Sequence, residues 1–114
     1  MIALELGRFR QLKKADFSWN LGLSAAGWRQ LLGGLSAGVE DLSVGKNSLD
    51  DEKAAEIAPQ LDRFQLLKKA DFSFNDRVSA AGWRELLGSL VAGVEHLDFT
   101  RCELDDEKGA SLKL

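Results

Sequence analysis

The stretch Leu12-Lys13-Lys14-Ala15-Asp16-Phe17-Ser18 returns unchanged at residues 67–73, a shift of 55 positions. The stretch Ser24-Ala25-Ala26-Gly27-Trp28-Arg29 returns at residues 79–84 with the same shift of 55 residues. More than half of the aligned positions match at this spacing, which is far beyond what shared composition would give. Self-similarity at a fixed period indicates a repeat architecture, in which neighbouring units bury a continuous core between them.

A weaker repeat lies inside the 55-residue period, at shifts of 27 and 28 residues. It follows the pattern L-x-x-L-x-L-x-x-N/C, where x is any residue. The defining positions are Leu12, Ala15, Phe17, Asn20; Val39, Leu42, Val44, Asn47; Leu67, Ala70, Phe72, Asn75; and Val94, Leu97, Phe99, Cys102. The sequence predicts one domain, residues 1–114, made of a partial helix (1–11), unit 1 (about 12–38), unit 2 (39–66), unit 3 (67–93) and unit 4 (94–114).

This pattern resembles the leucine-rich-repeat family, and the long repeat with a helical second half is most similar to the ribonuclease-inhibitor-like subtype. The resemblance covers essentially the whole chain. It implies an α/β fold, a right-handed leucine-rich-repeat solenoid with parallel strands on the concave face and helices on the convex face. It also implies an asparagine ladder after the strands, formed by Asn20, Asn47 and Asn75, with Cys102 as the fourth rung. For Cys102, a buried structural thiol is favoured over a reactive one.

The second half of each unit has the hydrophobic spacing of an amphipathic helix. Trp28, Leu31, Leu32 and Leu35 recur at intervals of three and four residues, which places Trp28 and its counterpart Trp83 in the core. The expected helix starts are Ser24, Asp50, Ser79 and Asp105, whose side-chain oxygens can accept an orphan backbone N–H. Gly38 and Gly93 are expected to close helices in a left-handed conformation, and Pro59 to end or kink one.

Alternate strand residues should point away from the core and form ladders, with one residue from each unit. One ladder, Asp16, Ser43, Asp71 and Asp98, is polar and mostly acidic; another, Trp19, Lys46, Phe74 and Arg101, alternates aromatic rings with cations. These eight residues are the candidate protein-binding residues of the concave face. Exposed aromatic residues often anchor protein interfaces, but Trp19 and Phe74 can equally serve the structure through cation–π contacts within the ladder.

The composition offers little for catalysis. The net charge of −3 comes from interspersed acids and bases, so the sequence has no basic cluster that would indicate binding to nucleic acid or to a membrane surface. The single histidine, His96, and the single cysteine, Cys102, are not expected to meet, and the acidic runs suit helix starts better than a calcium loop. We expect no catalytic, cofactor-binding or metal-binding residues, hence no enzyme, and a cytoplasmic location unless the chain is engineered.

The segments 2–6 and 112–114 both fall at the repeat phase of residues 57–61, so their apolar residues Ile2, Leu6, Leu112 and Leu114 are candidate self-association residues at the two ends of the chain. The leading hypothesis is a non-catalytic repeat scaffold, an engineered, duplicated or excerpted module that self-associates through uncapped ends. The alternative is a protein-binding module, a fragment of a natural leucine-rich-repeat protein that uses its concave face. The partner is the chain itself under the first hypothesis and another protein under the second.

Overall fold

The fold is a single row of alternating strands and helices. The computed structural model describes Leu6 and residues 8–106. Its elements are β1 (Lys14–Asp16), α2 (Ala25–Gly34), β2 (Asp41–Ser43), α3 (Asp51–Leu61), β3 (Lys69–Asp71), α4 (Ala80–Gly88) and β4 (His96–Asp98). Among the described residues, no helix is long and apolar enough to cross a lipid bilayer.

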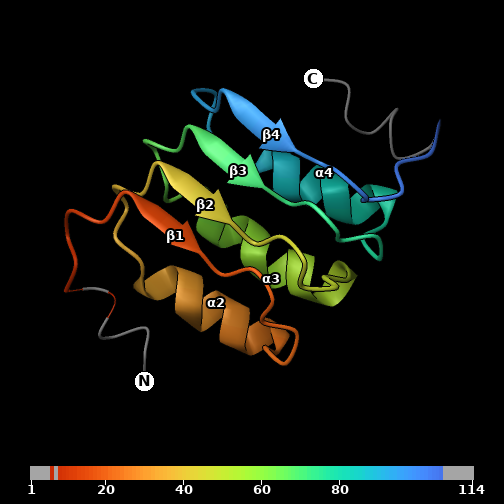
Figure 1. Cartoon of the computed structure of the whole chain (residues 1–114), viewed down its shortest axis with the longest axis horizontal. Coiled ribbons are helices and arrows are strands. Elements are labelled where there is room, and N and C mark those ends of the chain that lie inside the picture. The colour runs from red at the N-terminus through yellow and green to blue at the C-terminus, as the bar shows by residue number, and fades with distance from the viewer. Residues whose placement is uncertain (1–5, 7, 107–114) are drawn as a thin grey trace.

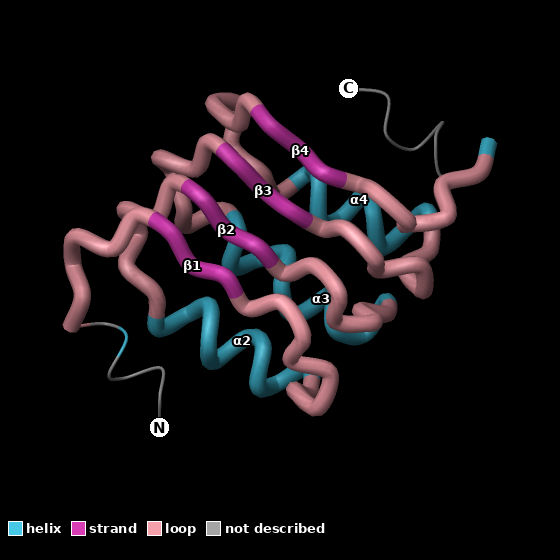
Figure 2. The backbone as a smooth tube through the Cα atoms, viewed as in Figure 1, coloured by secondary structure: helices cyan, strands magenta, loops and turns pink. Residues whose placement is uncertain are grey.

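The four strands form one parallel sheet in the order β1-β2-β3-β4 (Figure 1). In the register of this sheet Ala15, Leu42, Ala70 and Leu97 stand side by side, as the repeat pattern predicts. The helices α2, α3 and α4 lie in a second layer on one side of the sheet, and within the described residues the other side carries no helix (Figure 2). The prediction of an α/β fold with parallel strands alternating with helices is confirmed.

The core lies between the sheet and the helices. Trp28 and Trp83 are fully buried there, as predicted from their helical spacing. The ring of Trp83 meets Phe72 edge-on at 5.8 Å and Phe99 at 5.3 Å between centroids, a geometry that aromatic pairs favour. The indole N–H groups of both tryptophans are buried without a hydrogen-bond partner, so their burial rests on packing alone.

Three helix starts, those of α2, α3 and α4, are fixed by the residues that the sequence predicts, and the helix expected to begin at Asp105 lies almost entirely outside the described residues. The side chains of Ser24, Asp50 and Ser79 accept hydrogen bonds from the backbone N–H three residues later, which satisfies one orphan donor of each helix. Helix α3 continues two residues past Pro59 and ends at Leu61. A proline there removes one bond of the last turn, and the helix stops shortly afterwards.

The expected left-handed glycines are a wrong prediction. Helices α2 and α4 end at Gly34 and Gly88, several residues before Gly38 and Gly93, and no described glycine has a positive φ. The carbonyl groups at the end of α2 are satisfied by a side chain instead. The guanidinium of Arg63 donates to the carbonyl oxygens of Leu32 at 2.8 Å and of Leu35 at 3.0 Å. A charged donor therefore takes the role that was expected of a glycine turn.

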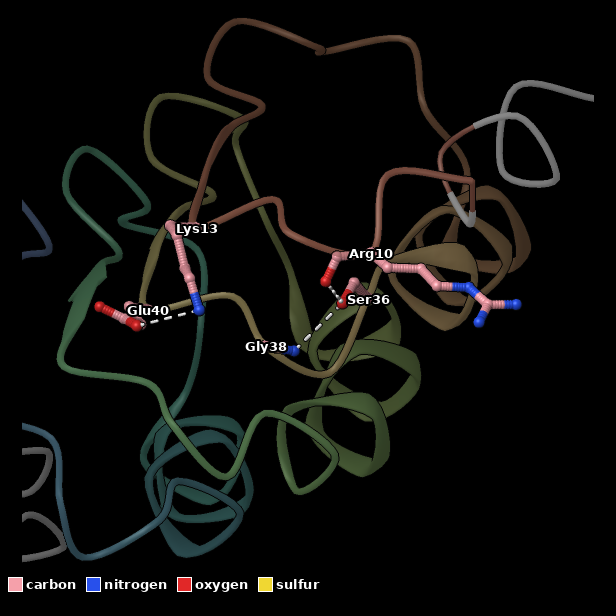
Figure 3. A network of polar contacts seen from close by, with 5 residues as sticks. All are labelled: Arg10, Lys13, Ser36, Gly38 and Glu40. Atoms are coloured by element: carbon pink, nitrogen blue, oxygen red, sulfur yellow. Dashed lines mark hydrogen bonds and ion pairs between the residues drawn. The ribbon is translucent and has the colours of Figure 1, made fainter.

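The loop between α2 and β2 is held against the segment that precedes β1 (Figure 3). The hydroxyl of Ser36 donates to the carbonyl of Arg10 at 3.2 Å and accepts from the Gly38 N–H at 3.3 Å. Close by, the ammonium of Lys13 and the carboxylate of Glu40 form an ion pair at 3.4 Å, joining the starts of two neighbouring units. These contacts join the segments that lead into β1 and β2.

Candidate protein-binding groove

The third residue after each strand adopts a left-handed backbone, and in units 2 and 4 Ser48 and Glu103 do so as well. The φ values are 66° for Trp19, 58° for Lys46, 58° for Phe74 and 59° for Arg101. Bulky residues rarely take this conformation, which costs about 1–2 kcal/mol per residue. Two of these residues are held by the neighbouring unit, because the N–H groups of Lys46 and Phe74 each donate to a carbonyl of the next unit at 2.7 Å.

In units 2 to 4 the residue after this turn is buried, and its side chain connects neighbouring units. Asn47 and Asn75 are fully buried. The Asn75 amide donates to the carbonyls of Phe72 (2.9 Å), Ser73 (3.2 Å) and Val44 (3.2 Å), and its oxygen accepts from the N–H groups of Asn47 and Leu49. In the fourth unit the thiol of Cys102 is buried and donates to the Phe72 carbonyl at 3.1 Å.

The left-handed residues project their side chains into a groove beyond the end of the sheet. The groove measures about 380 Å³ and takes two residues from each unit: Trp19 and Leu21, Lys46 and Ser48, Phe74 and Asp76, Arg101 and Glu103. The Trp19 side chain is 68% exposed and that of Phe74 is 45% exposed. The ammonium of Lys46 lies 5.5 Å from the Trp19 ring and 5.6 Å from the Phe74 ring, within the range of a cation–π contact to both.

The acidic ladder serves a different purpose from the groove. Asp16, Asp71 and Asp98 each accept a hydrogen bond from the N–H two residues later, at 2.8–2.9 Å, which fixes the chain as it leaves the strand. In unit 2 the hydroxyl of Ser43 donates to the second carboxylate oxygen of Asp71 at 3.2 Å. We therefore infer that this ladder fixes the chain at the ends of the strands and does not form part of the proposed groove.

The carboxyl groups of Asp16 and Asp98 have a lowered pKa. The N–H of Ser18, and then its hydroxyl, lower the pKa of Asp16 below its ordinary value. The hydroxyl of Thr100, and then its N–H, lower the pKa of Asp98 in the same way. Hydrogen bonds to a charged carboxylate favour the charged form.

These lowered pKa values predict a small loss of stability in acid. A carboxyl with a lower pKa in the folded state adds stability above its unfolded pKa, and this contribution is lost as the pH falls through the folded pKa. We expect Asp98→Asn to flatten the decline in unfolding free energy below about pH 4, measured by urea titration at several pH values. An unchanged slope in acid would show that the hydrogen bonds to Asp98 do not stabilise the folded chain.

The structure brings together four of the eight predicted surface residues, Trp19, Lys46, Phe74 and Arg101. Asp71 and Asp98 line a separate depression over the sheet, together with His96. Of the four residues predicted at the chain ends, Leu6 is half-buried and packs against the core, while Ile2, Leu112 and Leu114 lie outside the described residues. Within the described part of the chain, no cluster of three metal-ligating side chains occurs.

Half of the groove lining was missed by the sequence analysis: Leu21, Ser48, Asp76 and Glu103. They share one position of the repeat, two residues after the aromatic–cation ladder. That regular spacing is the signal that could have found them. Their varied chemistry concealed it, because an apolar residue, a hydroxyl and two acids occupy the same position.

The groove holds backbone strain that a flexible residue should release. Glycine takes a left-handed backbone without a steric penalty. We expect Arg101→Gly to raise the free energy of unfolding by about 0.5–1 kcal/mol, because the relief of strain exceeds the loss of an exposed side chain. Urea denaturation monitored by circular dichroism would measure this difference. A destabilised variant would mean that Arg101 makes contacts worth more than the strain.

Parallel strands joined by helices, the in-register core positions and the asparagine rungs together define a leucine-rich-repeat-like domain. A solved structure with a similar fold is the tropomodulin C-terminal domain of Caenorhabditis elegans, with a TM-score of 0.76 and 14% identity over 96% of this chain and 69% of that one. The leucine-rich repeat-containing protein LegL7 from Legionella pneumophila gives a TM-score of 0.45 and 15% identity, over 90% and 45% of the two chains. At such identities the likeness to the tropomodulin domain concerns the fold. No protein-family model and no curated protein sequence matches the chain.

Proposed function

We propose that this chain is a non-catalytic protein-recognition module built from leucine-rich repeats of the ribonuclease-inhibitor-like subtype. The observation that supports this function is the groove, where Trp19 and Phe74 are exposed although their backbone is strained. Strain of this kind gathers at functional sites, and exposed aromatic residues on a rigid support are typical anchors of protein interfaces. A volume of about 380 Å³ is within the usual range for a ligand site.

A random twelve-residue peptide library displayed on phage tests this proposal, because it presents many candidate partner sequences to the groove at once. The immobilised chain is expected to enrich peptides that lose at least tenfold in affinity for the Trp19→Ala, Phe74→Ala double variant. Both side chains are exposed, so the variant should keep its fold, which circular dichroism verifies. Leu66→Ala is the matched control, because Leu66 is also exposed, at 52%, but lies outside the groove.

Two outcomes would contradict the proposal. One is a selection in which no peptide is enriched over the empty support. The other is a set of enriched peptides that bind the double variant and the intact chain equally well. In either case the exposed aromatic residues would be features of the fold, and the recognition function would have to be sought elsewhere on the molecule.

Head-to-tail stacking of two copies is a second candidate function, supported by the outer side of β4. Leu97 is 38% exposed and Leu104 is 41% exposed, whereas the equivalent residues of unit 2, Leu42 and Leu49, are buried against unit 3. Unit 1 has nearly the sequence of unit 3. A second copy could therefore place its unit 1 on unit 4 and repeat the contacts seen between units 2 and 3.

Light scattering behind size exclusion, over a wide range of protein concentration, tests this stacking. The expected mass rises above 12.5 kDa with concentration, and Leu97→Asp returns it to the monomer value. Leu66→Asp, an exposed substitution away from β4, should leave the mass unchanged. A constant monomer mass at every concentration would rule the stacking out and leave the groove as the binding surface.

A further inference from the structure

We propose that the groove binds a peptide segment in the polyproline II conformation, with two prolines on the rings of Trp19 and Phe74 and an acidic residue between them facing Lys46. This inference rests on the proposed recognition function and adds the chemistry of the partner. Two features of the groove carry it: the spacing of the two rings and the position of the positive charge.

The spacing of the rings matches a polyproline helix. The two ring centroids are at most about 11 Å apart, because the ammonium of Lys46 lies 5.5 Å from one and 5.6 Å from the other. Equivalent residues two strands apart in a parallel sheet are separated by about 9.6 Å, and Trp19 and Phe74 are such a pair. Residues three apart in polyproline II lie on one face, separated by about 9.3 Å. Residues on one face of an extended strand are about 6.6 Å or 13 Å apart, and neither distance suits the two rings.

Conformational entropy favours a polyproline segment over a helical ligand. Residues seven apart in an α-helix are separated by about 10.5 Å and would also span the rings. A polyproline segment is already close to its bound conformation, so it loses little conformational entropy on binding, and such segments commonly dock in grooves lined by aromatic residues.

The position of Lys46 favours an acidic residue between the prolines. The groove also contains Arg101 and the carboxyl groups of Asp76 and Glu103, so this preference rests on the place of Lys46 and not on the total charge of the groove. Lys46 stands between the two rings, and the groove residue from its own unit is the neutral Ser48. A carboxylate that acts on Lys46 is that of Asp16, which already accepts two hydrogen bonds from Ser18. A ligand carboxylate that reaches Lys46 would thus gain a charged partner in a space partly shielded by two rings.

Isothermal titration with three synthetic peptides tests the inference. The first contains Pro-Glu-Ala-Pro at its centre, the second has lysine in place of the glutamate, and the third has glycine in place of both prolines. The first peptide is expected to bind at least tenfold more tightly than either of the others. Its affinity should fall at least tenfold for Trp19→Ala and for Phe74→Ala.

A charge exchange completes the test. Lys46→Glu should weaken the glutamate peptide and strengthen the lysine peptide, whereas a merely structural role for Lys46 would weaken both or neither. Failure of the glutamate peptide to bind, or binding that survives the loss of both rings, would overturn the inference. If the phage library still yields peptides that depend on the groove, the recognition function stands and only the ligand chemistry proposed for it is wrong.

Discussion

Asn75→Ala is expected to lower the free energy of unfolding by about 3–5 kcal/mol, a large part of the stability of a small domain. The side chain of Asn75 satisfies three carbonyls with its amide and two N–H groups with its oxygen, and it is fully buried. Alanine would leave the N–H groups of Asn47 and Leu49 without partners in a site that water does not reach. Each of the three carbonyls would keep one other donor, namely the Cys102 thiol, the Lys46 N–H or the Asn47 amide. A buried polar group without a partner costs about 1–3 kcal/mol.

The chain contains its own control for this prediction. Asn20 occupies the same position of the repeat, but its side chain is exposed. Water can replace its bonds to the carbonyls of unit 1, so Asn20→Ala should cost no more than about 1 kcal/mol. Urea denaturation of both variants, followed by circular dichroism, measures the difference. Equal losses would show that burial between units adds nothing to the strength of the asparagine ladder.

Trp83→Ala is expected to cost about 3–5 kcal/mol, comparable to the loss of Asn75 but by a different route. Trp83 is fully buried, and its ring contacts Phe72 and Phe99, so alanine would open a cavity where α4 meets β3 and the segment after β4. A shifted urea midpoint is again the measurement. The expected consequence is a loss of packing between units 3 and 4.

Trp83→Phe separates the packing of the ring from its polar group. Phenylalanine keeps an aromatic side chain at the site and removes an indole N–H that has no partner, so the expected loss is only about 1–2 kcal/mol. If this variant were as unstable as Trp83→Ala, the indole N–H would have to make a bond that stabilises the fold. That result would contradict the description of the site as packing alone.

Features that depend on periodicity were predictable from the sequence. The 27- and 28-residue shifts align Ala15, Leu42 and Ala70, and the structure pairs these residues in adjacent strands. The helix starts at Ser24, Asp50 and Ser79 were predictable because a capping side chain acts locally. Burial of Trp28 and Trp83 followed from helical spacing, which a repeat preserves in each pair of units.

Features that depend on backbone geometry were not predictable. Nothing in the residue types of Trp19, Lys46 or Phe74 indicates a left-handed conformation, which the bonds to the next unit impose on Lys46 and Phe74. Glycine was expected to supply the positive φ, and the described glycines do not.

Gly45 is required because there is no room for a side chain at this position. A Cβ there would lie 2.8 Å from the Ser73 hydroxyl and 3.1 Å from its carbonyl.

The same limit applies to the groove. The aromatic–cation ladder could be written from the sequence, but the acidic ladder beside it was assigned to the same face. Only the structure shows that the aspartates use an oxygen to fix the chain after each strand, while the ladder of Trp19 and Phe74 opens into a groove. The direction of a side chain at a turn depends on φ, which the spacing of residue types does not determine.

The most direct test of the recognition function is a ¹⁵N–¹H correlation spectrum of the chain with and without a peptide enriched from the phage library. The groove predicts that the largest shifts fall on the indole N–H of Trp19 and on the backbone of Lys46, Phe74 and Arg101. Shifts confined to Leu97, Leu104 and their neighbours, with the Trp19 indole unchanged, would contradict it and place binding on the outer side of β4.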